Sequence, residues 1–218
     1  MIRLILSCVM FLPCVVFAQY FPLKVSANGL YFEDQNSTPI FLNGDGGWDL
    51  STAVTYAAAD TYLTDCQQKG INYIHTRMIT TAFIDNAPNN VYNVSPFTGR
   101  VFTSPRELYF AHLDSIVWLA HTKRIVLQLY PCYLGYGCAA SEGWCPSVDT
   151  TAADSMKWWG QYVGNRYKNF PNILWGIGGD ADPTARKTKL DSLVAGSGVP
   201  AGTCRGCGHP PDGCPVAP

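Results

Sequence analysis

The sequence predicts an α/β fold of the (β/α)8 TIM-barrel type, truncated to about four βα units and preceded by an N-terminal β-hairpin. Four apolar runs recur along the chain, each followed by a loop and a helical stretch, and strands that alternate with helices form a parallel sheet covered by helices. The strand-to-helix joins are long and the helix-to-strand joins are short, which favours a barrel. A doubly wound sheet is the rival, but no glycine-rich phosphate loop opens the first helix.

Composition excludes two classes of protein. The chain has 218 residues, of which 47% are hydrophobic and 14% are charged, whereas disordered chains have low hydrophobicity and high charge. The formal net charge of −1 gives no basic surface for nucleic acid or an anionic membrane. The length suits one domain of the larger kind, or at most two small ones.

The first residues have the pattern of an export signal. Arg3 supplies a positive start, residues 2–17 are almost wholly apolar, and Ala18 offers a small residue for cleavage. We therefore expect a signal peptide at 1–18 and a secreted or periplasmic protein without a membrane contact after cleavage. An uncleaved anchor is the alternative, although the apolar run is short for a membrane span.

The mature chain begins with a hairpin pattern. Leu30–Glu33 and Pro39–Leu42 flank a polar turn at 34–37, which is typical of two antiparallel strands. The barrel domain is expected at 19–197. Its strands are predicted at Ile40–Asn43, Ile71–Met78, Arg124–Tyr130 and Asn172–Ile177. Its helices are predicted at about Thr55–Lys69, Pro105–Thr122, Thr151–Lys168 and Pro183–Ala195.

Polar side chains gather on one face of these strands, toward their C-terminal ends. Side chains alternate between the two faces of a strand, and active sites of barrels lie at the C-terminal ends of the strands. Because a buried polar group is costly unless it is paired, this convergence predicts a site; a satisfied internal network is the alternative. The candidates on this face are Asp45, His75, Arg77, Gln128, Tyr130 and, past the fourth strand, Asp180.

The stretch from 172 to 183 gives the sharpest candidate. Gly178 and Gly179 allow a sharp turn and a close approach of the backbone to a ligand. Asp180 follows where the strand ends, as a general acid/base would, and a hydrogen bond to a loop is its alternative role. Asp182 precedes Pro183 and a helical pattern, so we expect it to cap that helix.

The remaining candidates have competing interpretations. Arg77 can hold a substrate carboxylate bidentately, or pair internally with Asp45. His75 is expected to be a hydrogen-bonded barrel residue rather than a metal ligand, since no second ligand stands at a convincing spacing. Trp48, Tyr130 and Trp144 can stack on sugar rings or simply cover a core. No cofactor and no metal is expected.

The cysteines divide into three groups. Nine are present, and two lie in the expected signal, which leaves an odd number of seven. One disulfide is expected among Cys132, Cys138 and Cys145, and Cys66 is expected to be a buried thiol. The Pro/Gly-rich tail at 198–218 carries metal-type residues, but no flanking helix or hairpin pattern, so we expect it to be disordered or out of frame. Those tail residues are Cys204, Cys207, His209 and Cys214.

Three segments carry a family resemblance. Residues 30–48, with Gly-Asp-x-x-Trp at their end, resemble the opening hairpin and first strand of the apiosidase-like glycoside hydrolases. Residues 69–74 resemble their second strand, and residues 171–180 resemble their fourth strand and its acid. The resemblance runs from about Leu23 to about Ser197.

The resemblance implies a (β/α)8 barrel that hydrolyses glycosidic bonds in plant cell-wall pectin, with a poly- or oligosaccharide as its partner. Asp180 matches the family's general acid/base, and Asp45 and Trp48 match residues that line the sugar site. The family usually has threonine where Gly46 stands, which changes the contacts there. A monomer is expected.

The second catalytic carboxylate has no clear counterpart. Most glycosidases use two carboxyl groups, and the family's second one is a glutamate on a late strand that this sequence lacks. Glu142, Asp49 and Asp45 are the available replacements, of which Asp45 is the best placed. We therefore expect the chain alone to be inactive or nearly so. The simplest cause is a truncated or frame-shifted gene model, in which the residues from about Gly196 onward do not belong to the family's sequence. The alternatives are a non-catalytic carbohydrate-binding relic and a cysteine-rich secreted binding protein.

Overall fold

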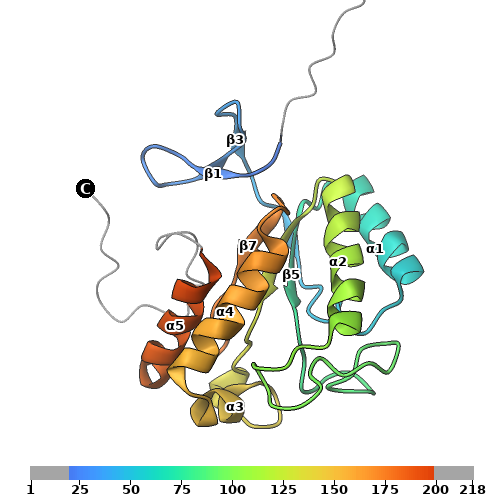
Figure 1. Ribbon diagram of the computed structural model, residues 1–218. Helices are drawn as coiled ribbons and strands as arrows, with labels where there is room; N and C mark the ends of the chain where they lie inside the picture. Colours follow the sequence, from blue (N-terminus) through green and yellow to red (C-terminus); the bar gives the residue numbers. More distant parts are fainter. Residues whose placement is uncertain (1–19, 199–218) are drawn as a thin grey trace, which may run out of the picture. The chain divides into compact units, whose positions relative to one another are not determined.

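The computed structural model describes residues 20–198. These residues fall into two compact units, divided after Ile40 (Figure 1). The expected signal peptide at 1–18 and the cysteine-rich tail lie outside the described residues. Both therefore stay predictions.

The first unit is a small antiparallel sheet of three strands. Its strands are β1 (Lys24–Val25), β2 (Phe32–Glu33) and β3 (Pro39–Ile40), in that order. The carboxylate of Asp34 accepts hydrogen bonds from the backbone N–H groups of Asn36 (2.8 Å) and Thr38 (2.9 Å), which fixes the turn between β2 and β3. The structure thus has the expected antiparallel pair and adds β1 to it.

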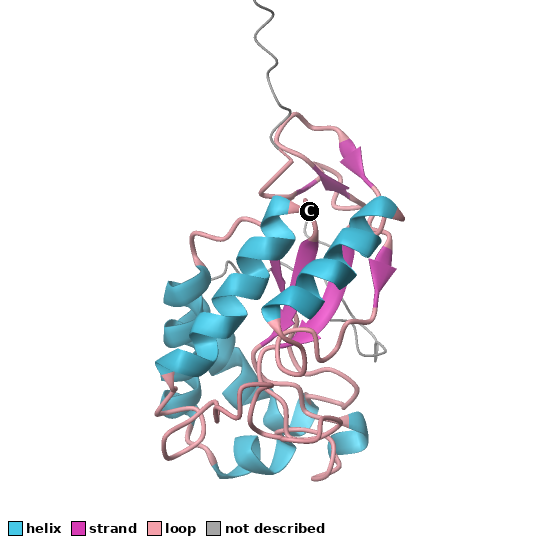
Figure 2. Ribbon diagram, turned by 90° about the vertical axis from the view of Figure 1, so that its right-hand side faces the viewer, coloured by secondary structure: helices cyan, strands magenta, loops and turns pink. Residues whose placement is uncertain are grey.

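The second unit is built on a parallel sheet. Its strands are β4 (Gly44–Asp45), β5 (Tyr73–Arg77), β6 (Val126–Tyr130) and β7 (Ile173–Trp175). They lie in sequence order, and each neighbouring pair is parallel. Figure 2 shows the strands with the helices beside them. The alternation of strands and helices therefore predicts the α/β class correctly.

The first strand of this sheet lies later than predicted. The sequence analysis places it at Ile40–Asn43, but Ile40 pairs with Phe32 in the first unit. The strand that joins β5 is Gly44–Asp45, with Gly44 opposite Tyr73 and Asp45 opposite Ile74. The register with Ile74 decides which way Asp45 faces.

Four main helices follow the four strands. They are α1 (Tyr56–Gln68), α2 (Glu107–Thr122), α4 (Ala153–Tyr167) and α5 (Lys187–Ser197). A short helix α3 (Cys145–Thr150) and two 3-10 turns, η1 (Tyr136–Cys138) and η2 (Thr184–Arg186), lie in the connections. The chain runs from 78 to 106 between β5 and α2, but only from 123 to 125 between α2 and β6. Long strand-to-helix joins therefore lie at the C-terminal ends of the strands, as expected.

Asp182 caps a turn rather than the last helix. Its carboxylate accepts a hydrogen bond from the backbone N–H of Thr184 (2.8 Å), and this bond lowers the pKa of Asp182. The residues after Pro183 form η2, and α5 begins only at Lys187. The expected helix start at Pro183 is thus wrong by one turn, while the structural role of Asp182 is confirmed.

Glycines allow α4 and α5 to pack with their backbones in contact. A Cβ atom at Gly160 of α4 would lie 2.0 Å from the carbonyl oxygen of Leu193, and one at Gly164 would lie 2.2 Å from that of Ser197. From the other side, a Cβ atom at Gly196 of α5 would lie 2.0 Å from the carbonyl oxygen of Lys157. No side chain fits at these three positions.

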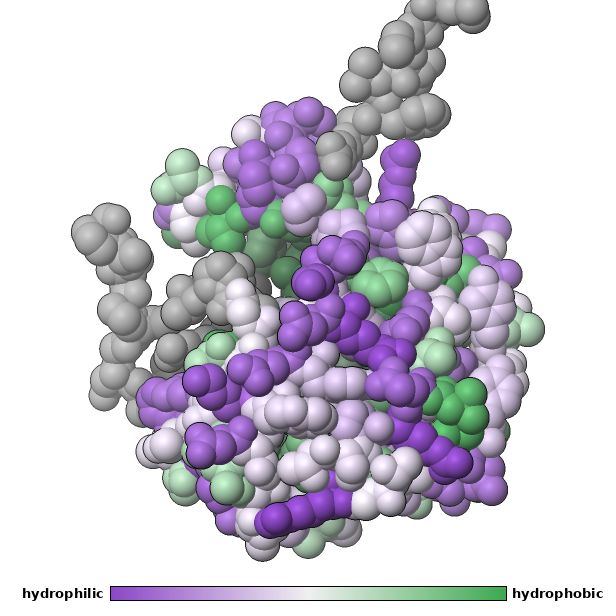
Figure 3. All heavy atoms as spheres, viewed as in Figure 1, coloured by the Kyte–Doolittle hydropathy of each residue, from purple (hydrophilic) through white to green (hydrophobic). Residues whose placement is uncertain are grey.

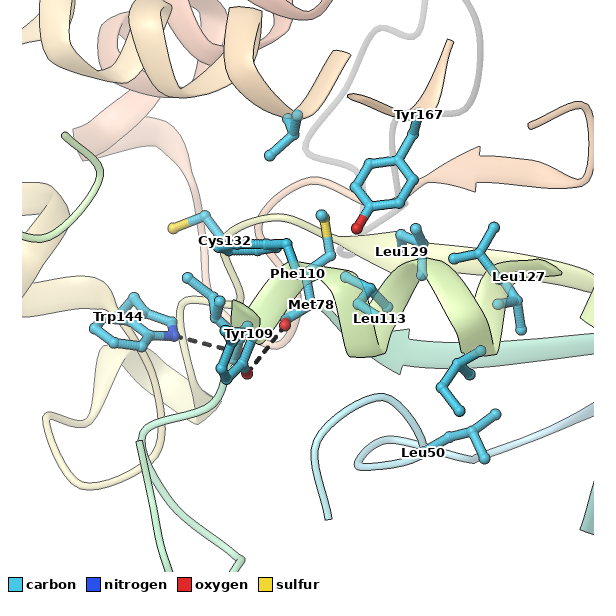
Figure 4. Close-up of a cluster of buried hydrophobic side chains, with 14 of the residues drawn as sticks. Leu50, Met78, Tyr109, Phe110, Leu113, Leu127, Leu129, Cys132, Trp144 and Tyr167 are labelled. Carbon is cyan, nitrogen blue, oxygen red and sulfur yellow. Dashed lines mark hydrogen bonds between the residues drawn. The ribbon is translucent and has the colours of Figure 1, made fainter. Parts of the chain in front are cut away.

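The core lies between the sheet and the helices (Figure 4). Ile74, Leu127 and Leu129 are fully buried on the helix-facing side of the strands. Two buried aromatic residues have paired polar ends: Tyr109 Oη donates to the carbonyl of Met78 (3.2 Å) and Trp144 Nε1 to that of Ile79 (3.4 Å). This pairing is what a buried hydroxyl or indole N–H requires.

One disulfide joins Cys138 and Cys145, which confirms a bridge in this loop. Cys66 and Cys132 are free and buried, as expected for Cys66. Within residues 20–198, none of the helices combines the length and the apolar character that crossing a bilayer needs.

Candidate functional site

The site begins with the register of two central strands. His75 of β5 lies opposite Gln128 of β6, and Arg77 lies opposite Tyr130. Because the strands are parallel and in register, these four side chains share one face of the sheet. Ile74 lies on the other face, in the core. The alternation along β5 and β6 therefore predicts this face correctly.

Trp48 organises an aromatic cluster on this face. Its ring centroid lies 5.4 Å from His75, 5.3 Å from Tyr130 and 5.4 Å from Tyr133. The backbone N–H of Arg77 donates to the carbonyl of Trp48 (2.9 Å), which fixes the chain after β4 beside β5. Trp48 is half-buried, so part of its ring can meet a ligand. We name the Trp48, His75, Tyr130 and Tyr133 rings the aromatic cluster.

Two glycines after β7 make room for the tyrosines of this cluster. A Cβ atom at Gly176 would lie 2.5 Å from the ring of Tyr130, and one at Gly179 would lie 2.4 Å from the ring of Tyr133. Gly179 also has a φ of 101°, a conformation that favours glycine. The close approach that these glycines permit is therefore to protein side chains.

Asp180 lies at the edge of the aromatic cluster. Tyr133 Oη donates a hydrogen bond to Asp180 Oδ2 (2.8 Å), and the backbone N–H of Gly137 donates to the Asp180 carbonyl (3.0 Å). The side chain is otherwise exposed, so Oδ1 is open to a ligand. Burial, followed by the hydrogen bond to Asp180, raises the pKa of Tyr133, and the phenol therefore stays protonated as the donor at neutral pH.

His75 is a neutral residue of the same face. Burial lowers its pKa, against the opposing effects of the Asp180 charge and a hydrogen bond with Gln128. Gln128 in turn accepts a hydrogen bond from Tyr73 Oη. Within residues 20–198 no cluster of three metal-type side chains exists, and His75 Nδ1 is buried without a partner. The structure places His75 in a hydrogen-bonded network, as the sequence analysis expects.

Arg77 is paired internally, but not with the predicted partner. Its side chain is only 4% exposed and forms a salt bridge with Asp49. Its guanidinium lies 5.5 Å from the ring centroid of Tyr133 and 5.1 Å from that of Phe83. The predicted pairing with Asp45 is therefore wrong. Arg77 contacts the aromatic cluster through Tyr133, and its burial keeps it from binding a substrate carboxylate.

Asp45 does not join the cluster. It accepts hydrogen bonds from Tyr62 Oη of α1 (2.7 Å) and from the backbone N–H of Gly46 (2.8 Å). Asp45 lies opposite Ile74, whose side chain is buried in the core. The carboxylate therefore lies toward α1, and its expected position on the His75 face is wrong because Asp45 pairs in register with Ile74.

The other candidates also have structural partners. Glu142 accepts a hydrogen bond from the backbone N–H of Tyr136 (3.2 Å), although its charge acts on Tyr133 as that of Asp180 does. Burial raises the pKa of Asp49, and its salt bridge with Arg77 opposes this effect. Trp144 is 5% exposed and belongs to the core, so the core-covering interpretation of Trp144 is confirmed.

Sequence reasoning misses Tyr133. The alternation along β6 ends at Pro131, so it gives no face for a residue two positions later. The available signal is the aromatic and glycine-rich composition of the loop after β6, in the region where barrel enzymes place functional side chains.

A family model matches the sequence, and solved structures match the fold. The model "Apiosidase-like, catalytic domain" matches residues 26–200. A structure described as a glycoside hydrolase is 25% identical, with a TM-score of 0.66, and the match covers 82% of this chain and 40% of that one. A family 5 glycoside hydrolase from Bacteroides vulgatus ATCC 8482 is 24% identical, with a TM-score of 0.66, and the match covers 82% of this chain and 38% of that one. No curated protein matches the chain.

A more distant likeness extends the fold comparison. A family 5 mannosidase from Rhizomucor miehei has a TM-score of 0.53 at 14% identity, with 81% of this chain and 55% of that chain covered. The chain thus spans about two fifths of the first two structures. Since the family model covers most of the sequence, the chain belongs to the apiosidase-like catalytic domain family, whose structural neighbours are glycoside hydrolases.

Proposed function

We propose that this chain supplies the general acid/base and one wall of the sugar site of an exported glycoside hydrolase that acts on pectic polysaccharide. The observation that carries the proposal is the placement of Asp180, held through Oδ2 by Tyr133 while Oδ1 stays open beside the aromatic cluster. Family membership supports a carbohydrate substrate, and the pectic class rests on the apiosidase-like resemblance.

The residues around Asp180 suit a glycosidic bond. A protonated Asp180 would donate its proton to the oxygen of the leaving sugar, which is the general-acid step of glycosidases. The half-buried face of Trp48 offers an apolar surface for the C–H groups of a sugar ring. Gln128 and the neutral His75 offer hydrogen bonds that do not require charge. Together these groups can bind a sugar and protonate its linkage.

We further propose that the second catalytic carboxyl group comes from a barrel segment that the larger relatives have. Glycosidases place their two carboxyl groups roughly 5–5.5 Å apart or 6.5–9.5 Å apart. Within residues 20–198, Asp45 and Glu142 each accept a hydrogen bond from another residue, and Asp49 forms a salt bridge. The chain alone is then expected to bind sugar without turnover, so carbohydrate binding is the second candidate function.

Two features support export. The disulfide between Cys138 and Cys145 belongs to the class of bonds that persist in oxidising compartments. The pattern of residues 1–18 is that of a signal peptide.

Binding and hydrolysis are tested separately, by calorimetry with pectic oligosaccharides and by release of reducing sugar. The wild-type chain should bind, and Trp48→Ala should lower the affinity about tenfold, equivalent to about 1.4 kcal/mol. Asp180→Asn should leave the affinity within about threefold of wild type and abolish any hydrolysis. Asp182→Asn is the matched control and should change neither, because asparagine also caps turns.

Three results would contradict the proposal. If the wild-type chain hydrolyses a pectic oligosaccharide, equal hydrolysis by Asp180→Asn would exclude Asp180 as the acid. Loss of hydrolysis only in Glu142→Gln would identify the catalytic carboxyl group elsewhere. No binding of any pectic oligosaccharide by the wild-type chain would exclude the sugar site.

A further inference from the structure

A surface hollow of about 320 Å³ lies in the long loop after β5, beside the site but outside it. Phe83, Asp85, Asn86 and Asn90 are among its lining residues. Phe83 packs on Arg77, and Arg77 also lies against Tyr133 of the aromatic cluster. Arg77 therefore connects one lining residue of the hollow, Phe83, to the aromatic cluster.

Asn90, one of the residues that line the hollow, carries a buried hydrogen-bond donor without a partner in the described part of the chain. The residue is 1% exposed, and its Oδ1 accepts from the backbone N–H groups of Tyr92 (3.0 Å) and Val94 (3.1 Å). Its Nδ2 is buried and has no partner within the described part of the chain. A buried amide donor is costly when it is unpaired, so an oxygen of a molecule in the hollow would satisfy it.

Phe83 supplies an apolar surface at the same place. Its side chain is 65% exposed, although it is a large hydrophobic residue. Its φ is +70°, in the left-handed region that bulky residues rarely adopt and that recurs at ligand-contact positions. One side of the ring lies 5.1 Å from the Arg77 guanidinium, which the salt bridge with Asp49 holds in place. The exposed part of the ring is thus an apolar surface for a ligand, and the other side of the ring packs on a fixed side chain.

The charged residues at the hollow indicate which kind of ligand it can bind. Asp85 is exposed and acidic, and no lysine, arginine or histidine is among the described residues that line the hollow. Arg77, the nearest cation by its contact with Phe83, is already paired with Asp49. A ligand carboxylate would meet repulsion without a compensating cation, whereas hydroxyl groups can donate to Asp85 and accept from Asn90.

We propose that this hollow is a second sugar subsite, which binds a neutral, hydroxyl-rich sugar ring next to the sugar at Asp180, and which disfavours a uronate there. The C–H face of the ring packs on Phe83, one hydroxyl oxygen accepts from Asn90 Nδ2, and another hydroxyl donates to Asp85. The inference rests on the proposed function, because the two subsites would hold neighbouring sugars of one oligosaccharide.

The test compares two probes by calorimetry: a pectic oligosaccharide that carries a neutral side-chain sugar, and an oligogalacturonide of equal length. Asn90→Asp keeps the Oδ1 acceptor, which binds the backbone of the loop, but replaces the Nδ2 donor by an oxygen. This variant should bind the neutral-branched probe about tenfold more weakly. Phe83→Gly should do the same while it relieves the backbone strain, so thermal stability should not fall. Phe83→Tyr is the matched control and should bind within about twofold of wild type.

The outcomes separate this inference from the proposed function. If Asn90→Asp and Phe83→Gly both bind the neutral-branched probe as wild type does, while Trp48→Ala loses affinity, the subsite is excluded and the proposed function stands. Equal or tighter binding of the oligogalacturonide by the wild-type chain would contradict the preference for a neutral ring. If the wild-type chain binds neither probe, the proposed function itself fails.

Discussion

Tyr133 donates a 2.8 Å hydrogen bond to Asp180 across 47 residues of sequence. This bond joins the loop after β6 to the end of β7. The carbonyl of Tyr133 also accepts from the backbone N–H of Trp144 (2.8 Å), so the far end of the same loop holds Tyr133 in place. The orientation of the candidate acid therefore depends on a folded loop, and this dependence can be tested.

The first prediction concerns the phenol of Tyr133. Burial raises its pKa most, and the hydrogen bond and charge of Asp180 raise it further. Asp180→Asn removes the charge but not the burial, so the pKa of Tyr133 should fall part of the way toward its ordinary value of 10.0. Titration of chains with 13C-labelled tyrosine rings, followed by NMR, measures this change.

Tyr130 gives the internal comparison for that titration. Its pKa is also raised by burial first and by the Asp180 charge second, but Asp180 acts on Tyr130 through its charge alone. The Tyr133 resonance should therefore move more than the Tyr130 resonance. An unchanged Tyr133 pKa in Asp180→Asn would show that the hydrogen bond does not form in solution.

The second prediction concerns pH. Burial lowers the pKa of His75 below its ordinary value of 6.5, so the unfolded chain binds a proton more readily than the folded chain does. The corresponding stability is present above the ordinary value and is lost as the pH falls through the lowered folded value. The free energy of unfolding should therefore decrease between about pH 7.5 and about pH 5, measured by urea denaturation.

His75→Gln should reduce this pH dependence without abolishing it. His112 contributes in the same direction, because burial also lowers its pKa. A slope that is identical in wild type and in His75→Gln would show that His75 has the same proton affinity in both states.

Three site residues show what a local sequence pattern can and cannot predict. His75 and Gln128 are correctly placed, because both lie inside five-residue strands where alternation holds. Asp45 is misplaced because β4 has only two residues and its start depends on pairing with Tyr73 and Ile74, far along the chain. A strand of two residues is too short to show an alternation of polar and apolar side chains.

The ion-pair partner of a residue likewise depends on contacts between residues that are far apart in the sequence. Two aspartates of the β4 region, Asp45 in the strand and Asp49 after it, are available to Arg77, and the structure pairs it with Asp49. The hydroxyl of Tyr62 already binds Asp45. Which carboxylate meets which cation depends on where α1 packs, and the residue types alone do not contain that information.

The third prediction tests the salt bridge of Arg77 with Asp49. Arg77 is 4% exposed and Asp49 is 24% exposed, so removing the carboxylate strands the more deeply buried charge. Asp49→Asn should cost about 2–4 kcal/mol of unfolding free energy. Arg77→Met should cost less, because Asp49 keeps partial contact with water and can take up a proton. Chemical denaturation of both single variants and of Asp49→Leu with Arg77→Met measures the asymmetry.

Recovery of stability in the double variant is the decisive comparison. An apolar pair of similar volume is often no less stable than a buried ion pair. If Arg77→Met proves more destabilising than Asp49→Asn, the desolvation argument is wrong.

The fourth prediction concerns the contact between α4 and α5. Gly160→Ala places a Cβ atom against the carbonyl oxygen of Leu193, and a backbone atom cannot move aside as a side chain can. The variant should lose about 1–3 kcal/mol of unfolding free energy. Asn165→Ala, an exposed position of the same helix, is the control and should change it by less than about 0.5 kcal/mol. Equal stability of Gly160→Ala and wild type would contradict the close packing of these helices.

The last prediction links the disulfide to the candidate acid. Cys138 and Cys145 close a loop seven residues apart in sequence, which Tyr133 and Gly137 connect to Asp180. Changing both cysteines to serine should cost about 2–3 kcal/mol of unfolding free energy through the loop-closure entropy of the unfolded chain. The affinity for pectic oligosaccharide should fall as well, because the loop that orients Tyr133 becomes less constrained.

Reduction separates the bond from the substitutions. Dithiothreitol should lower the stability and the sugar affinity of the wild-type chain to the values of the double serine variant, and should leave that variant unchanged. Cys66 and Cys132 are free and buried in the described structure, so they give the reductant no bond to break there. A wild-type chain whose stability falls on reduction while its sugar affinity stays constant would show that Tyr133 and Asp180 keep their arrangement without the disulfide.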